Sequence, residues 1–203
     1  MPYFQLLGYR GIHNCVAKWE ENIVFHICNR CVYIAQQLVV GWIELFAHDE
    51  YREIFVESIN YCQTKKGLEV YAWCIMRNHI HMIISSNGEK PLPGIIRDLK
   101  SYTSRAIRKM LEKNLADSRV NRMLAIFKET GKKNKRNYDF QLWQQHNHPI
   151  ELRSNEMMDQ RLDYIHDNPV KAGFVDLPEH WLWSSAIDYY GEGKGKIDLL
   201  YIL

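Results

Sequence analysis

The chain has 203 residues, 46% of them hydrophobic and 25% charged, a composition that excludes disordered, collagen-like and coiled-coil proteins. Its length fits one domain whose core needs no disulfide scaffold, and its formal net charge is +2. Five cysteines, an odd number, favour a reducing compartment, and Cys28 and Cys31 form a C-x-x-C with no second pair to complete a zinc site.

The sequence also bears on location. The first residues, Met1 to Gln5, show no basic segment followed by an apolar stretch, so we expect no signal peptide. The longest apolar run, Leu38 to Ala47, is interrupted by Glu44 and is far shorter than the roughly 20 residues of a membrane span. We therefore expect a soluble, cytoplasmic protein without membrane contact.

The first third of the chain predicts an extension, a strand and a helix. Residues 1–32 have no clear period and form an atypical N-terminal extension. Tyr33 to Val40 predicts a strand, in spite of two glutamines within it. Asp49 to Lys65 predicts a helix that ends at Gly67.

A hairpin follows. Leu68 to Met76 predicts a central strand, because it is apolar on both faces, and His79 to Ser85 predicts its partner across an Arg77–Asn78 turn. Residues two apart on a strand point the same way. His79 and His81 therefore share one face, and Ile80 points to the opposite, buried face.

A basic helix is predicted next, after a loop at Pro91–Gly94. Its docking stripe comprises Ile95, Leu99, Tyr102, Ala106 and Met110, widened by Ile96, Ile107 and Leu111. The cations Arg97, Arg105 and Arg108 fall on its other side, and Gly131 to Asn137 predicts an exposed basic loop.

The charge is unevenly distributed. The segment Arg97–Arg136 holds 13 of the 26 basic residues and 4 of the 24 acidic ones. Such a local excess of positive charge indicates a polyanionic partner such as nucleic acid. Phosphate contacts of this kind give affinity without sequence choice.

The last quarter predicts an extended segment, a helix and a packed end. Phe140 to Leu152 is predicted to be extended. Asn155 is predicted to cap a helix that runs to about Asp167 and stops at Pro169. Residues 176–203 predict a packed C-terminal segment. The order of elements indicates an α+β fold with helices packed on one mainly antiparallel sheet.

Two groups of residues could carry chemistry. The His79–His81 pair on one rigid strand forms half of a metal site, whereas His146 and His148 have the same spacing in a polar stretch before a proline. On the predicted helix after residue 155, Met158, Leu162 and Ile165 form a docking face. Another face presents Arg161, Tyr164 and Asn168.

These residues carry a resemblance. Tyr71–Ile84 resembles the HUH motif of the single-tyrosine transposases, which include insertion-sequence enzymes and REP-associated tyrosine transposases, and Leu162–Val175 resembles that family's second signature. The resemblance covers about Tyr33 to Tyr190. It implies an HUH domain at 33–190 and a C-terminal tail at 191–203. The Tyr-Ile-x-x-Asn-Pro-Val signature favours the REP-associated group.

The resemblance implies a ferredoxin-like α+β sandwich with the HUH pair on a central strand. His79 and His81 would be metal ligands, Tyr164 the nucleophile and Asn168 the third ligand, with His166 a nearby competitor that points to the other side of the helix. The family's metal would be Mg²⁺ or Mn²⁺, although two isolated imidazoles would suit Zn²⁺ equally well.

The reaction implied is attack of a tyrosine on a phosphodiester, giving a 5′-phosphotyrosine and a free 3′-OH that later rejoins DNA. A divalent ion would polarise the phosphate, because a phenol, which ionises near ~10, is a weak nucleophile at neutral pH. Family substrates are single-stranded, hairpin-forming DNA. Residues of the basic segment would line the phosphate path, namely Arg97, Arg105, Arg108, Lys132 and Lys133, and Trp143 is predicted to be exposed and to stack bases.

Three questions stay open at this level. An inactive hairpin-binding relic would bind the same DNA without forming an adduct, and a zinc hydrolase using His79 and His81 is a rival enzyme. The family contains both monomers and homodimers. The atypical extension at 1–32 leaves the activity of this copy open as well.

Overall fold

The computed structural model describes residues 31–134, 139–145 and 149–201. The predicted N-terminal extension up to residue 30 and the pair His146 and His148 therefore lie outside the described residues. The described strands are β1 (Val32–Leu38), β2 (Leu68–Ile75), β3 (His79–Ser86) and β4 (Ile150–Leu152). The described α-helices are α2 (Asp49–Lys66), α3 (Leu92–Lys113), α4 (Ser118–Lys132), α5 (Asn155–Lys171) and α6 (Ala186–Tyr190).

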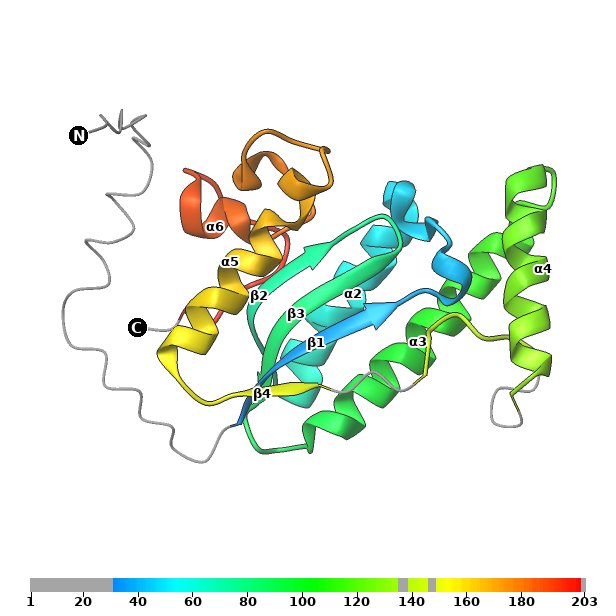
Figure 1. Cartoon of the computed structure of the whole chain (residues 1–203). Coiled ribbons are helices and arrows are strands. Elements are labelled where there is room, and N and C mark those ends of the chain that lie inside the picture. Colours follow the sequence, from blue (N-terminus) through cyan, green and yellow to red (C-terminus); the bar gives the residue numbers. More distant parts are fainter. Residues whose placement is uncertain (1–30, 135–138, 146–148, 202–203) are drawn as a thin grey trace.

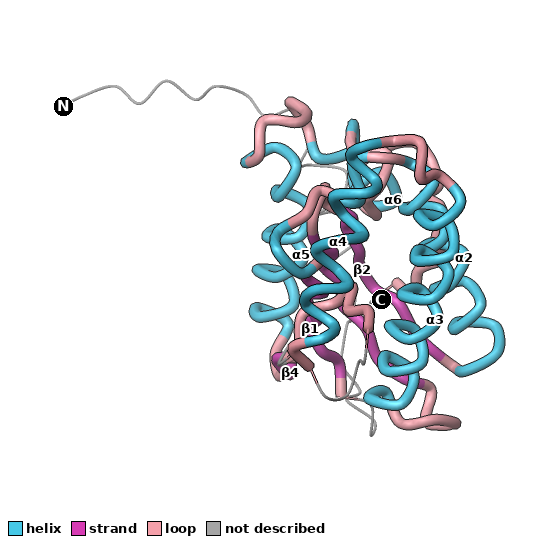
Figure 2. The backbone as a smooth tube through the Cα atoms, turned by 90° about the vertical axis from the view of Figure 1, so that its right-hand side faces the viewer, coloured by secondary structure: helices cyan, strands magenta, loops and turns pink. Residues whose placement is uncertain are grey.

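The four strands form one antiparallel sheet in the order β2-β3-β1-β4 (Figure 1). With α2 between β1 and β2 and α3 between β3 and β4, the chain follows the β-α-β-β-α-β order of ferredoxin-like folds. Helices α2 and α3 cover one face of the sheet and α5 covers the other (Figure 2). The predicted α+β class and the central antiparallel sheet are confirmed.

Two cores result from the alternation of side chains along the strands. Ile80, Met82 and Ile84 of β3 pack into the larger core beneath α2 and α3. Ile83 belongs to the smaller core beneath α5. Because both faces are covered, β2 and β3 are apolar on both sides.

The prediction that Leu68 to Met76 is a central strand is wrong, because β2 is an outer strand of the sheet. Its two faces are covered by α2 and α5, and Ser184 of the C-terminal segment pairs with Cys74 at its edge.

Helix α2 is confirmed to within one residue. It ends at Gly67, whose φ of 68° is in the left-handed region and whose N–H donates to the carbonyl of Cys62. Within the described residues, no helix has the length and hydropathy needed to cross a membrane.

The basic segment forms two helices, of which the sequence pattern predicts only the first. Helix α3 begins at Leu92, inside the predicted loop, since prolines are tolerated in a first turn whose N–H groups have no helical partner. The predicted basic loop is wrong at its start, because α4 continues through Gly131 to Lys132. Tyr102, predicted on the docking stripe of α3, is 56% exposed, and Thr103 is buried in its place.

Among the described residues from Phe140 to Leu152, only β4 is a strand. Trp143, predicted to be exposed, is buried. Its ring stacks on Phe46 at a centroid distance of 5.9 Å, and its Nε1 donates to Oγ1 of Thr103 at 3.0 Å. An indole this large is placed in the core because it removes much apolar surface from water while its N–H keeps a partner.

Helix α5 differs from the prediction at both ends. Its N-cap is Ser154, whose side chain accepts from the N–H of Met157, and not Asn155. The helix passes Pro169 and ends at Lys171. The proline removes one backbone donor in the last turn, where few helical hydrogen bonds remain to be lost, and its ring is buried.

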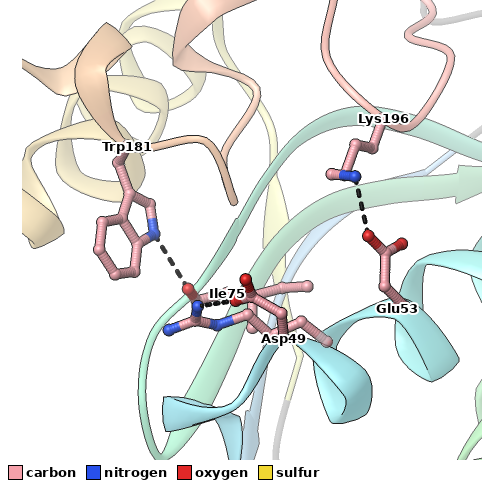
Figure 3. Close-up of polar contacts among 6 residues, drawn as sticks. Asp49, Glu53, Ile75, Trp181 and Lys196 are labelled. Carbon is pink, nitrogen blue, oxygen red and sulfur yellow. Dashed lines mark hydrogen bonds and ion pairs between the residues drawn. The ribbon is translucent and has the colours of Figure 1, made fainter.

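The C-terminal segment is docked on α2 and β2 (Figure 3). Nε1 of Trp181 donates to the carbonyl of Ile75 at 3.0 Å, and Lys196 pairs with Glu53 at 2.8 Å. The guanidinium of Arg52 lies over the rings of both Trp181 and Trp183, and it binds Asp49. Because β2 is an outer strand, these contacts cover an edge that would otherwise be open.

Candidate active site

The histidine pair lies at the start of β3, between β1 and β2. The imidazole centroids of His79 and His81 are 4.7 Å apart, with the rings nearly perpendicular at 89°. His79 is half-buried and His81 is buried. Ile80 points into the opposite core, as the period of a strand predicts.

Tyr164 of α5 lies directly against this pair. Its ring centroid is 5.3 Å from that of His81, and the two rings meet edge-on at 82°. The site is exposed to solvent on the side of Tyr164, because the tyrosine is 40% exposed while His81 beneath it is 2% exposed. The fold therefore brings together the two motifs that the sequence places far apart.

Helix α5 is oriented by its apolar face. Met158, Leu162 and Ile165, the predicted docking face, are buried in the smaller core against residues of β2 and β3. Tyr164 precedes Ile165 and is thereby turned to the edge of the contact, where its ring meets His81 and is partly exposed to solvent.

Asn168 lies one helical turn after Tyr164, as predicted. Its Nδ2 donates to the carbonyl of Tyr164, so the side chain folds along its own helix. This contact fixes the amide nitrogen and leaves Oδ1 as the atom that a cation would bind. Helical geometry persists at Asn168 despite the proline that follows it.

One neighbour sets the tautomer of His79. Its Nδ1 is 2.6 Å from Oδ1 of Asn78. A carboxamide oxygen only accepts, so Nδ1 carries the proton and Nε2 keeps its lone pair. Partners of this kind orient metal-binding imidazoles in proteins. The sequence analysis placed Asn78 in a turn and did not identify this contact.

Both imidazoles are neutral near pH 7. Burial lowers the pKa of His79, and burial together with the charge of His79 lowers the pKa of His81 to about 3. Nε2 of His81 is buried and has no hydrogen-bond partner among the described residues. A lone imidazole nitrogen without a partner is costly to bury, and coordination of a cation would satisfy it.

The residues present fit a divalent cation that is bound by two imidazoles and completes its coordination with oxygen ligands. Within the described ranges, no group of three or more His, Cys, Asp or Glu gathers at any point. Beyond the two imidazoles, a cation here would take amide, phosphate or water oxygens, which suit Mg²⁺ and Mn²⁺.

Gln36 is a further residue at this face that the sequence analysis missed. It lies on β1 directly opposite His81 in the β1–β3 register, and its side chain is exposed. Residues directly opposite in antiparallel strands share a face, with Cβ atoms roughly 5 Å apart. The strand pairing alone would have identified Gln36, but pairing cannot be read from a single sequence.

His166 is confirmed on the other side of α5 from Tyr164. It is buried, its Nε2 is 2.7 Å from Oγ of Ser185, and its ring packs on Tyr189 and Tyr190. It therefore belongs to the packing of the C-terminal segment, away from the histidine pair.

The predicted phosphate-binding cations lie elsewhere. Arg97 and Arg105 are exposed on α3, and Lys132 and Lys133 are exposed at the end of α4. Core residues of both helices belong to the larger core, together with Ile80 of β3, which points away from the histidine pair. The structure therefore does not bring these cations together with Tyr164.

Arg108 is engaged within the fold. Its guanidinium binds both carboxylate oxygens of Asp139, at 3.1 and 2.9 Å, and Glu112 at 2.9 Å. It also lies over the ring of Phe140. These partners hold Arg108 between α3 and the segment that follows α4.

Comparison with known proteins finds a similar family. Residues 43–123 match the family model described as transposase IS200 like. Over these residues, the chain is similar to IS200-like transposases. The transposase match includes the histidine pair, and Tyr164 and Asn168 lie beyond its end.

Similarity to one solved structure supports the fold of the chain. A REP-associated tyrosine transposase bound to a REP hairpin matches with a TM-score of 0.55 and 16% identity, over 83% of this chain and 88% of that one. A candidate transposase from Deinococcus radiodurans R1 matches with a TM-score of 0.38 and 17% identity, over 68% of this chain and 90% of that one. No curated protein sequence matches.

Proposed function

We propose that this chain is a single-tyrosine transposase that cuts and rejoins single-stranded, hairpin-forming DNA. The observation that carries the proposal is the contact of the Tyr164 ring with His81, which joins a nucleophile to a histidine pair with a free nitrogen. The similarity of residues 43–123 to IS200-like transposases and the hairpin bound by the similar solved structure support the substrate. Such a substrate would place the enzyme in the cytoplasm.

The proposed step is a transesterification. The Tyr164 oxygen attacks a backbone phosphorus, a phosphotyrosine bond forms to the 5′ side, and the bond to the 3′ oxygen breaks. The phenolic proton passes to water and the departing oxygen becomes a 3′-OH. Attack of a 3′-OH on the phosphotyrosine reverses the step, rejoins DNA and needs no ATP, because the energy of the bond is conserved.

Four groups of the chain are proposed to hold a Mg²⁺ or Mn²⁺ ion. They are Nε2 of His79, Nε2 of His81 and the amide oxygens of Asn168 and Gln36. When bound, the ion would polarise the scissile phosphate. The protein's own contribution is positional: Asn78 orients His79, and the docking of α5 holds the phenol at the edge of the pair.

A covalent-trapping gel tests the proposal. Labelled hairpin DNA with unpaired flanks is mixed with the protein in Mg²⁺ or EDTA and then denatured. We expect a protein–DNA band with metal only, lost completely in Tyr164→Phe. Tyr61→Phe, which alters an exposed tyrosine on α2, is the matched control and should keep the band.

Other outcomes identify the rivals. DNA binding without any adduct would contradict the enzyme proposal and favour an inactive hairpin-binding relic. Strand cleavage that persists in Tyr164→Phe and follows added Zn²⁺ would favour a zinc hydrolase.

A further inference from the structure

Arg161 is the one member of the predicted face of Arg161, Tyr164 and Asn168 that the proposed mechanism does not use. It lies on α5 three residues before Tyr164, a rise of about 4.5 Å along the helix axis. Residues three or four apart are neighbours on a helix surface, so Arg161 and Asn168 flank the tyrosine from its two sides along the axis. Arg161 therefore lies one helical turn from the proposed nucleophile.

The edge of α5 that carries Arg161 borders the sheet. At about 100° per residue, Arg161 falls between Tyr164 and Ile165 around the helix. Ile165 is buried in the smaller core, and the ring of Tyr164 contacts His81. Arg161 is half-buried, as a position between these two requires. Its side chain therefore starts at the border of the core contact, on the same edge of the helix as the tyrosine.

The guanidinium of Arg161 is uncompensated. It forms no ion pair and no hydrogen bond with any residue that the structure describes. The residues three and four positions away along α5 carry no negative charge; they are Met157, Met158, Tyr164 and Ile165. The helix therefore holds a free positive charge beside the active site.

Other cations near the site are already engaged. Arg77, in the turn between β2 and β3, pairs with Glu44 at 3.5 Å. Lys171, at the end of α5, pairs with Asp167 at 3.3 Å. Arg161 differs from both because an incoming anion would not have to displace a partner from it.

A guanidinium in this position suits a phosphate. It has five N–H donors in a planar fork that can bind two oxygens of one phosphate, and it has no acceptor atom with which to bind a cation. The scissile phosphate is proposed to be held by the ion at the histidine pair. One helical turn together with the length of the arginine side chain spans the distance to the next phosphate of the DNA strand.

We propose that Arg161 binds the phosphate next to the scissile one and thereby positions the DNA strand against Tyr164. The inference rests on the proposed function and deepens it by naming a residue that aligns the substrate. Because the contact is to the backbone, it would hold DNA of any sequence.

Single methylphosphonate linkages, which carry no charge, test the inference on the unaltered protein. Once the cleaved phosphate is mapped in a labelled hairpin with unpaired flanks, the phosphate on each side of it is replaced in turn. Adduct formation is then measured against DNA concentration. We expect the neutral linkage at one of the two positions to raise the half-saturating concentration about tenfold and to change the maximal rate by less than about threefold.

Variants then assign the effect to the side chain. Arg161→Met keeps an apolar stem and removes the charge, so it should raise the half-saturating concentration of ordinary DNA about tenfold. The neutral linkage should weaken this variant no further, because both changes remove the same contact. Arg161→Lys keeps the charge without the planar fork and should recover part of the loss.

The matched control is Arg153→Met. It removes an exposed guanidinium just before α5 that Glu151 already binds at 2.9 Å. This variant should match the unaltered protein on every DNA.

Two results would overturn the inference and leave the proposed function intact. Both neutral linkages could react as ordinary DNA does, or the neutral linkage could weaken Arg161→Met as much as it weakens the unaltered protein. If the unaltered protein forms no adduct with ordinary DNA, the proposed function itself fails, and the inference fails with it.

Discussion

Burial of neutral histidines is the most consequential feature at the scale of single residues. His81 and His166 are both almost fully buried, and burial lowers the pKa of each to about 3. Each imidazole is therefore neutral in the folded protein. A neutral imidazole suits a metal ligand at His81 and a hydrogen-bonded packing residue at His166.

A pH dependence of stability follows. Between about pH 3 and the ordinary histidine pKa of 6.5, the unfolded chain binds more protons than the folded chain, so stability is complete above this range and falls as the pH is lowered through it. We expect the free energy of unfolding of the metal-free protein to fall by about 1 kcal/mol per pH unit for each histidine.

Urea unfolding from pH 7 to pH 5 measures this slope. His166→Gln should flatten it by one histidine's share, whereas His48→Gln, at an exposed histidine, should leave it unchanged. An equal slope in all three proteins would contradict the assignment of His166.

At the scale of elements, the end of α4 shows how packing overrides a local pattern. The run after Gly131 has the composition of a loop, yet Gly131 is buried in the helix against the backbone of Phe140. A Cβ built at Gly131 would lie 2.2 Å from the nitrogen of Phe140. The glycine is therefore needed for close approach of two backbones.

Two matched glycine substitutions test this. Gly131→Ala should lower the free energy of unfolding by about 2 kcal/mol, since neither backbone can yield easily. Gly94→Ala, in the first turn of α3 with open space around the added Cβ, should raise it by about 0.5 kcal/mol. Urea denaturation of both variants measures the difference, and equal effects would show that Gly131 is not packed as described.

At the scale of the whole molecule, the site is assembled within one chain. Helix α5 packs on the same sheet that carries the histidine pair, and Tyr164 contacts His81 of its own chain. The C-terminal segment then binds across α2 and β2, with Ile197 buried and the N–H of Leu200 donating to the carbonyl of Val70. The segment expected as a tail at 191–203 is thus packed over its described part.

If each active site is assembled within one chain, two inactive variants cannot complement each other, and a mixing experiment tests this. Tyr164→Phe keeps the histidine pair and His81→Ala keeps the nucleophile, so a mixture restores a complete site only if subunits exchange α5. We expect each variant to be inactive in the trapping gel and their mixture to stay inactive. Recovery of the adduct on mixing would indicate a homodimer with shared sites.

Local periodicity predicted the elements that depend on neighbours in the sequence. The span of α2 and its end at Gly67, the β2–β3 hairpin, the shared face of His79 and His81, and the docking face of α5 follow from patterns of two or 3.6 residues. The resemblance carried by the two motifs indicated a family to which residues 43–123 are also similar, and it indicated the fold that the structure shows. The proposed roles of Tyr164 and Asn168 still rest on that resemblance.

Tertiary structure decided what depends on partners distant in the sequence. Trp143 is buried because Phe46 and Thr103 cover it, Gln36 joins the histidine face because of strand register, and α5 continues past Pro169 because its last turn has few hydrogen bonds to lose. A residue's period determines which way it points within its element. Which surface it then meets depends on how the elements pack, and a single sequence does not contain that information locally.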